Sequence, residues 1–224
     1  MGIISKAFQA TIGGAAATVG TFAFYTRNAK FVPLSPSDPI FSSKDFIRQN
    51  PNLNPCTQDL CIKRVPLSKI KPQLLEKDGK LIEKFVAGVF SGPGYAFQRA
   101  YLERKYKGPE TEHQLWSRPE LKSSSYEVGQ HITDHFEVVE HTSDKITVRC
   151  GGSPRVRDVR EGDGLFEMFA RQNKDEGVVE FGMKSVFFQG LGRAERAPMP
   201  SHIVFLHQQY TKLWMESGVG NVTL

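Results

Sequence analysis

Alternating apolar and polar residues predict four strands in the second half of the chain. Each segment is rich in Val, Ile, Phe and Thr and is bounded by turn residues, which is typical of strands. The segments are residues 131–140, 145–150, 164–172 and 177–188. The short connections 141–144 and 173–177 suit antiparallel hairpins. The pattern therefore predicts an antiparallel meander.

One amphipathic helix is expected to follow the meander, after a loop rich in Gly, Pro and Ala. Ser201 suits the N-cap position of this helix. A stripe of mostly apolar residues then recurs at spacings of three and four: Ile203, Leu206, His207, Tyr210, Leu213 and Trp214. Such a stripe needs an apolar surface, so we expect the helix to lie on the sheet in an α+β fold.

The segment before the meander reads as a strand followed by helices. A strand is expected at 59–66, and helical patterns occupy 68–76, 80–90 and 95–106. The sequence Ser91-Gly-Pro-Gly94 separates the last two of these helical patterns. A phosphate-binding loop is disfavoured because no Gly-Lys-Ser/Thr follows these glycines. We interpret the segment as a corner between two helices.

The N-terminus, residues 1–30, is an unusual hydrophobic segment. The first 37 residues contain no Asp or Glu, and residues 7–25 carry no charge between Lys6 and Arg27. This stretch approaches the ~20 residues that a helix needs to span a bilayer. We expect a single-pass anchor that makes the protein membrane-associated through residues 7–25. A mitochondrial-type presequence is the alternative.

Residues 31–58 are expected to form a linker or strap between this segment and a folded domain at 59–224. Five prolines in this stretch oppose regular helix and sheet hydrogen bonding. They are Pro33, Pro36, Pro39, Pro51 and Pro55.

Composition narrows the classes of function. The net charge is only +5, and the Lys and Arg residues are dispersed among Asp and Glu, so nucleic-acid binding is disfavoured. The three cysteines, Cys56, Cys61 and Cys150, form no CxxC pair and suggest neither a disulfide framework nor a zinc site. No nucleotide-binding loop, GxSxG elbow or HExxH helix occurs, and we expect no cofactor. The oligomeric state is left open.

The chain resembles a known superfamily over roughly its last hundred residues, and more loosely over 59–106. The resemblance rests on Gly164-Leu-Phe-Glu167, Phe187-Phe188-Gln-Gly190 and Phe205-Leu-His-Gln-Gln-Tyr210. It is to uncharacterised fungal proteins similar to the helix-grip superfamily, which includes START-like and polyketide-cyclase-like domains. The resemblance implies an antiparallel sheet wrapped around the C-terminal helix, with an apolar cavity between them. It also implies a place in fungal polyketide or terpenoid metabolism.

Candidate polar chemistry occurs first at His131-Ile-Thr-Asp-His135. Alternation puts His131, Thr133 and His135 on one strand face and Asp134 on the other. Two histidines at this spacing can bind a metal, but no third ligand follows at a recognisable spacing, so no metal site is predicted. His135 is a candidate general base, and a solvated strand face is the ordinary interpretation.

A second cluster of charges occupies residues 155–164 and continues to Glu167. Charges this dense at a strand entrance are usually a solvated turn. Their functional interpretation is the polar mouth of a cavity, in which arginines hold a carboxylate or enolate and carboxyl groups move a proton. The candidates are Arg149, Arg157 and Arg160 for the first role and Asp163 and Glu167 for the second.

The third candidate is His207, which shares the apolar stripe of the last helix with Tyr210. If its role is purely structural, His207 is a buried histidine that bonds to a backbone carbonyl. If its role is functional, His207 is an acid or base in a pocket with Tyr210, Phe181, Met183, Phe187 and Trp214.

The sequence therefore favours a cofactor-independent cyclase or isomerase that acts on a hydrophobic small molecule. A non-catalytic carrier of lipids or hydrophobic metabolites is the first alternative, because it needs the same cavity without an acid-base pair. A membrane-tethered accessory protein is the second, and it predicts a filled cavity and an exposed apolar patch.

Overall fold

A seven-stranded antiparallel sheet forms the centre of the molecule in this computed structural model, which describes residues 20–224. The strands lie in the order β1-β2-β7-β6-β5-β4-β3, and each pair of neighbours is antiparallel. Their bounds are β1 (Lys30–Val32), β2 (Thr57–Pro66), β3 (His131–Ile132), β4 (Phe136–His141), β5 (Lys145–Cys150), β6 (Gly162–Asn173) and β7 (Val178–Gln189). The prediction of an α+β fold with an antiparallel sheet and a C-terminal helix is confirmed.

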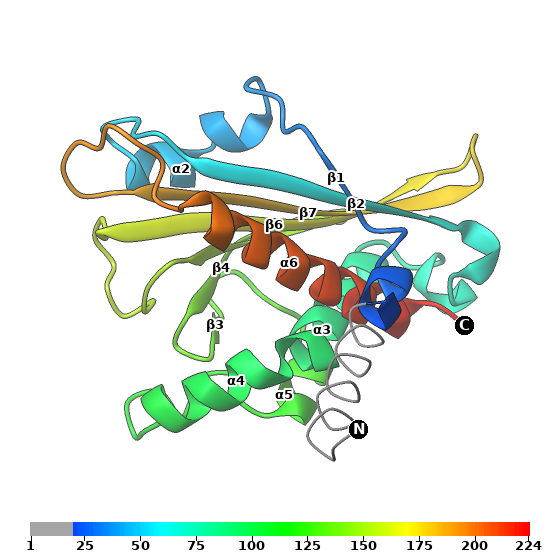
Figure 1. Cartoon of the computed structure of the whole chain (residues 1–224). Helices are drawn as coiled ribbons and strands as arrows, with labels where there is room; N and C mark the ends of the chain where they lie inside the picture. The colour runs from blue at the N-terminus through cyan, green and yellow to red at the C-terminus, as the bar shows by residue number, and fades with distance from the viewer. Residues whose placement is uncertain (1–19) are drawn as a thin grey trace, which may run out of the picture.

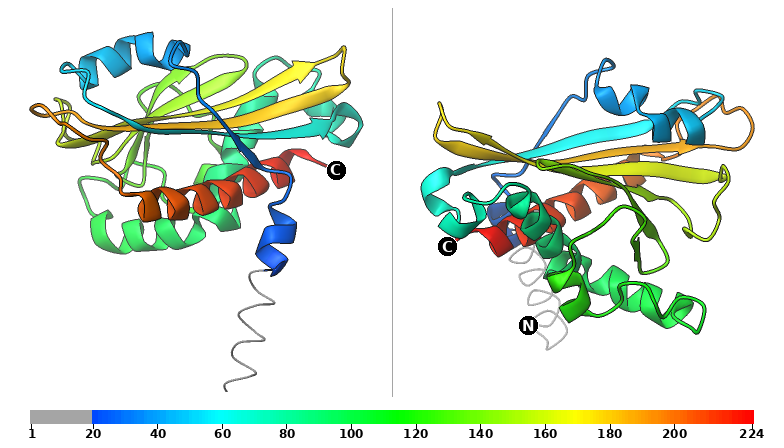
Figure 2. Two further views of the ribbon diagram at one scale, coloured as in Figure 1. Left: turned by 45° about the horizontal axis from the view of Figure 1, so that its top comes forward. Right: turned by 180° about the vertical axis from the view of Figure 1, so that it is seen from behind.

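Helices cover the sheet on both faces (Figures 1 and 2). The larger helices lie on one face, here called the helix-covered face: α3 (Lys80–Ser91), α4 (Pro93–Tyr106), α5 (Arg118–Ser123) and α6 (Ser201–Val222). The opposite, outer face carries the short elements η1 (Pro39–Ser42) and α2 (Lys44–Gln49). The helix expected at 68–76 is replaced by two 3-10 turns, η2 (Leu67–Lys69) and η3 (Pro72–Leu74), because Pro72 prevents a continuous helix.

Helix α6 crosses the helix-covered face, but only its second half is buried. Trp214 and Met215 are buried, whereas Phe205 and Leu206 are 60% and 59% exposed. The predicted stripe therefore packs on the sheet only from His207 onward. His207 already lies near the start of β2 and the end of β7, so the preceding turn has little sheet left to cover.

The position of α6 is set by a close helix crossing built on glycine. A Cβ atom at Gly88 of α3 would lie 2.5 Å from Asn221 Cβ and 2.9 Å from the Ser217 carbonyl oxygen. A Cβ at Gly218 would lie 2.5 Å from the Phe85 ring. Where α4 begins, Ser217 Oγ accepts a hydrogen bond from the backbone N–H of Gly94 at 2.9 Å. Small residues thus bring α6 against both α3 and α4.

The proline-rich strap is more ordered than its composition predicts. It contributes β1, η1 and α2, because Pro39 occupies the first turn of η1 and the other prolines lie outside the paired strand residues. Leu34, Ile40 and Phe46 pack on Leu165, Val186 and Phe188 of the outer face in a second apolar cluster. Both faces of β6 and β7 are therefore buried.

The strand expected at 131–140 is broken by a tight turn. Thr133 and Asp134 have φ values of 52° and 50°, and the N–H of His135 donates to the Ile132 carbonyl at 3.1 Å. Both central residues of the turn are thus left-handed, which is unfavourable for a β-branched residue. The Thr133 hydroxyl bonds with Tyr95, and the Asp134 carboxylate accepts from Gln114, Ser153 and Arg155. These contacts hold the strained turn.

No helix within residues 20–224 is long and apolar enough to cross a membrane. The expected N-terminal hydrophobic segment lies mostly outside the described residues.

The helix crossing leads to a stability prediction. Gly88→Ala should lower the free energy of unfolding by about 1–3 kcal/mol, because the added methyl group must displace the backbone of α6. Gly220→Ala is the matched control, since a Cβ there meets no atom of residues 20–224 within 4 Å. It should be neutral or stabilising by about 0.5–1 kcal/mol, as expected when alanine replaces glycine in a helix. Chemical denaturation measures both, and equal stabilities of the two variants would contradict the close crossing.

Candidate functional site

A pocket of about 180 Å³ lies between the sheet and the helices α4 and α6. Its lining is mainly aromatic, with a few polar groups from the helices. The lining residues are Gln98, His135, Phe136, Cys150, Phe166, Phe187, His207, Tyr210, Thr211 and Trp214. None of them carries a formal charge at neutral pH when the histidines are neutral. The arrangement is typical of a site for a hydrophobic small molecule.

Among the polar side chains of this pocket, His207 contacts a hydroxyl group, a carboxylate and an aromatic ring. Its Nε2 lies 3.1 Å from Ser185 Oγ and 3.3 Å from Asp59 Oδ2. Asp59 and Ser185 face one another across β2 and β7, so the two strands present both groups to α6 together. The His207 ring also packs edge-on against Phe187, with 5.1 Å between ring centroids. These contacts hold the imidazole in one orientation.

The Asp59 carboxylate is buried directly behind this histidine. Its side chain is 5% exposed, and neither of its oxygens forms a hydrogen bond within residues 20–224. A buried carboxylate without hydrogen bonds is costly unless a cation lies close to it. His207 is placed to supply that charge when it is protonated.

Two further polar groups of the pocket have no partner in the described part of the chain. They are the Tyr210 hydroxyl and the Trp214 indole N–H, both buried. The rings of these residues pack edge-on at 5.3 Å. Burial raises the pKa of Tyr210, while the nearby Trp214 indole acts in the opposite direction. Because unpaired buried donors are unfavourable, this end of the pocket is suited to a ligand oxygen or a water molecule.

His135 lines the pocket from the strained turn between β3 and β4. Burial and the positive charge of Arg160 together lower its pKa to about 4, against an opposing effect of the Asp134 carboxylate. Arg160 is 6% exposed and donates to the carbonyls of Val156 and Gly152, but its Nη2 is buried without a partner in residues 20–224. His135 is therefore neutral at physiological pH, and Arg160 adds a positive charge close to it.

The predicted carboxyl groups lie on the outer face of the sheet, away from the pocket. Glu167 accepts from Lys184 Nζ at 2.7 Å, and Lys184 also donates to Asp38 at 2.8 Å. Asp163 pairs with Arg149 at 2.5 Å, with both side chains almost fully buried. Alternation along β6 puts these two acids on the face opposite Phe166, which lines the pocket. They stabilise the outer face and do not take part in the pocket.

The other predicted binding residues lie in three places: the pocket, the core and the surface. Phe187, Tyr210 and Trp214 line the pocket, as do His135 and His207. Phe181 and Met183 lie on the same face but are fully buried in the core, where Phe181 packs on Phe85 of α3 at 4.8 Å. Arg157 is exposed and pairs with Glu137 at 2.7 Å.

Sequence reasoning missed several members of the site. Ser185 shares its strand face with Phe181, Met183 and Phe187, so the alternation of β7 contained the signal for it. Asp59 shares its face with Cys61 and Val65, which are buried in the main core. A carboxylate on the same strand face as core residues was thus a signal for a buried functional group. Gln98 of α4 and Thr211 of α6 carried no distinctive pattern.

Comparison with protein-family models, with curated proteins and with solved structures found no match to this chain. Within the described residues no group of three or more His, Cys, Asp or Glu side chains is arranged to hold a metal ion.

The depressed pKa of His135 leads to a pH-dependent prediction. In the unfolded chain histidine titrates near pH ~6.5, so between that pH and 4 the unfolded state binds more protons than the folded state. Stability is therefore lost as the pH falls through this range, by up to about 3 kcal/mol for a shift to about 4, at about 1.4 kcal/mol per unit. His135→Gln should remove that part of the loss. Denaturation at pH 7 and 4.5 measures it.

The control is His202→Gln, since His202 is exposed in the first turn of α6. This variant should keep the pH dependence of the wild type. A His135→Gln protein that loses as much stability on acidification as the wild type would contradict a neutral, buried His135.

Proposed function

We propose that the pocket binds the apolar part of a ketone- or enol-bearing small molecule and that His207 moves a proton on it. The observation that carries this proposal is that one aromatic pocket holds a histidine next to a buried carboxylate and two donors without a partner in residues 20–224. Acid-base work needs a proton carrier and a means of holding the substrate. The protein would then be a cofactor-independent isomerase or cyclase.

The proposed proton carrier is the ring nitrogen of His207 that is not directed to the sheet. When Nε2 carries the proton and faces Asp59, Nδ1 has a free lone pair, and it forms no hydrogen bond within residues 20–224. The histidine removes a proton from the carbon next to a carbonyl. The negative charge on the resulting enolate oxygen is stabilised by N–H and O–H donors of Trp214 and Tyr210. Asp59 stabilises the imidazolium that forms.

The size of the pocket suits one ring of a ligand. A dry cavity of about 150 Å³ binds benzene, so about 180 Å³ accommodates a ring-sized group with a carbonyl. A polyketide- or terpenoid-like substrate is proposed on the resemblance to the helix-grip superfamily and to fungal proteins. An antiparallel sheet with α6 across one face is consistent with that resemblance.

A non-catalytic carrier is the second candidate. It is favoured by the placement of Asp163 and Glu167, which leaves the pocket without the two carboxyl groups that the sequence suggested for moving a proton. A carrier needs the apolar cavity and the two donors but makes no use of the Asp59–His207 pair.

Hydrogen-deuterium exchange of cyclohexanone in D₂O distinguishes the two candidates. A general base at His207 should accelerate exchange at the carbons next to the carbonyl, and NMR follows the loss of those protons. His207→Gln, which keeps much of the side-chain volume, should reduce the protein-dependent rate by ~10²-fold or more. His202→Gln, outside the pocket, is the matched control and should exchange at the wild-type rate.

The binding of cyclohexanone is measured on the same proteins by the change in tryptophan fluorescence, to which Trp214 contributes from the pocket. Binding with no acceleration of exchange would support the carrier, and equal rates for wild type and a folded His207→Gln protein would reject proton transfer by His207. Absence of binding would reject the pocket as the site.

A further inference from the structure

Exposed apolar side chains gather on α4 and α6 beside the pocket. Phe97 on α4 is 86% exposed and Tyr101 one turn later is 54% exposed. On α6, Phe205 and Leu206 are 60% and 59% exposed. We call these four residues the apolar face. Each helix also contributes to the pocket next to them, since Gln98 follows Phe97 and His207 follows Leu206.

The two helices are in contact where α4 begins, and they carry the apolar face on either side of the pocket (Figure 1). Close to its start, α4 contacts the second half of α6, where a Cβ at Gly94 would lie 2.8 Å from the Leu213 carbonyl oxygen. One turn later, Gln98 lines the same pocket as Tyr210. Beyond Gln98, α4 and the first turns of α6 diverge (Figure 1). The apolar face thus borders the part of the pocket formed by α4 and α6.

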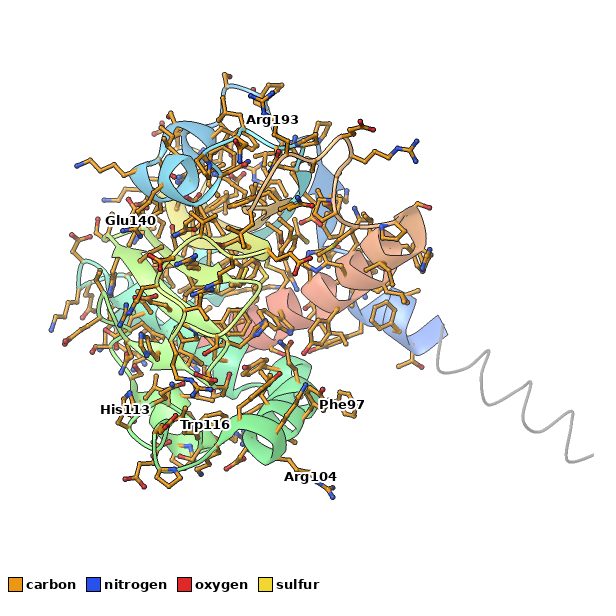
Figure 3. The ribbon with its side chains drawn as sticks, turned by 90° about the vertical axis from the view of Figure 1, so that its left-hand side faces the viewer. Phe97, Arg104, His113, Trp116, Glu140 and Arg193 are labelled. Carbon is orange, nitrogen blue, oxygen red and sulfur yellow. The ribbon has the colours of Figure 1, made fainter. Side chains whose placement is uncertain are left out.

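The chain enters the described structure on the same side of the molecule. Figure 3 shows Phe97, the first turns of α6 and the helical residues 20–25 on one side. Phe24 and Tyr25 at the end of that short helix are 67% and 52% exposed. In the sequence they end the uncharged stretch 7–25. The uncharged stretch of the sequence therefore ends, at Phe24 and Tyr25, on the side that carries the apolar face.

The charges on these elements are mainly positive. Arg104 and Lys105 of α4 are exposed, and Arg27 lies 3.8 Å above the Phe24 ring. The acids of the two helices are engaged, with Glu103 paired to Lys107 and Glu216 paired to Lys63. Exposed aromatics beside basic residues are typical of surfaces that bind anionic lipid. A second copy of the chain is a poorer partner, because it would bring like charges together.

We propose that the apolar face docks on an anionic lipid bilayer, with α4 and the first half of α6 lying at the interface. The docking does not depend on the chemistry of the pocket. Its consequence, that a hydrophobic ligand enters the pocket from the bilayer, rests on the proposed function. The docking differs from an anchor at residues 7–25, because it places the folded domain itself against the membrane in one orientation.

Site-specific fluorescence quenching tests this orientation on the full-length protein. A fluorophore is attached to Phe97→Cys, Leu206→Cys or Ile47→Cys in a Cys56→Ser background, since Cys61 and Cys150 are buried. The vesicles contain phosphatidylcholine and phosphatidylserine, and their acyl chains carry a nitroxide quencher. Ile47 is the matched control, because it is 53% exposed on α2 of the outer face.

Labels at 97 and 206 should be quenched strongly, and the label at 47 should not. Adding Phe97→Ser and Phe205→Ser to the protein labelled at 206 should reduce its quenching several-fold while the residues 7–25 are unchanged. Equal quenching at all three positions, or none at 97 and 206, would overturn the proposal.

Protection of the label at 97 without vesicles, together with a concentration-dependent rise in mass, would identify a second copy as the partner and also overturn it. The quenching samples contain no ketone. A failure of docking is therefore distinguished from a failure of proton exchange, which is measured in a separate experiment.

Discussion

The close contact of α6 with α3 and α4 is the constraint on which the pocket depends. Gly88 and Gly218 remove the side chains that would separate α3 from α6, and Ser217 accepts from the first turn of α4. Interiors packed at crystal-like density transmit small displacements, so a shift of α6 at this crossing moves everything it carries. His207 and Trp214 reach the pocket only because the second half of α6 is held in this place.

The two faces of the sheet differ in how their buried polar groups are satisfied. The outer face holds paired charges, such as Lys184 with Glu167, under a strap that excludes water. Buried charges of this kind are tolerated when each has a partner. Around the pocket, the helix-covered side instead holds aromatic rings and a few polar groups. The Asp59 carboxylate and Tyr210 Oη among them have no hydrogen-bond partner in residues 20–224. Unpaired polar atoms in an apolar cavity are the feature that distinguishes a binding site from core.

Much of the architecture could be predicted because its signals are local. The hairpin connections, α3, the break before α4 and α6 all follow from periodicity and turn residues. The face to which Glu167 belongs could not be predicted, since both faces of β6 are buried and alternation alone does not say which one meets α6. The turn at Thr133 was missed because its left-handed backbone is held by distant partners such as Tyr95, and these contacts leave no local pattern.

The most direct test of a ligand site at α6 is the indole N–H region of the ¹⁵N NMR spectrum. The chain has two tryptophans. Trp116 Nε1 donates to the Thr111 carbonyl at 2.6 Å, whereas Trp214 Nε1 is buried without a partner in the described structure. With signals assigned by Trp214→Phe, cyclohexanone should shift the Trp214 resonance and leave that of Trp116 in place. An unmoved Trp214 resonance at saturating ketone would contradict it.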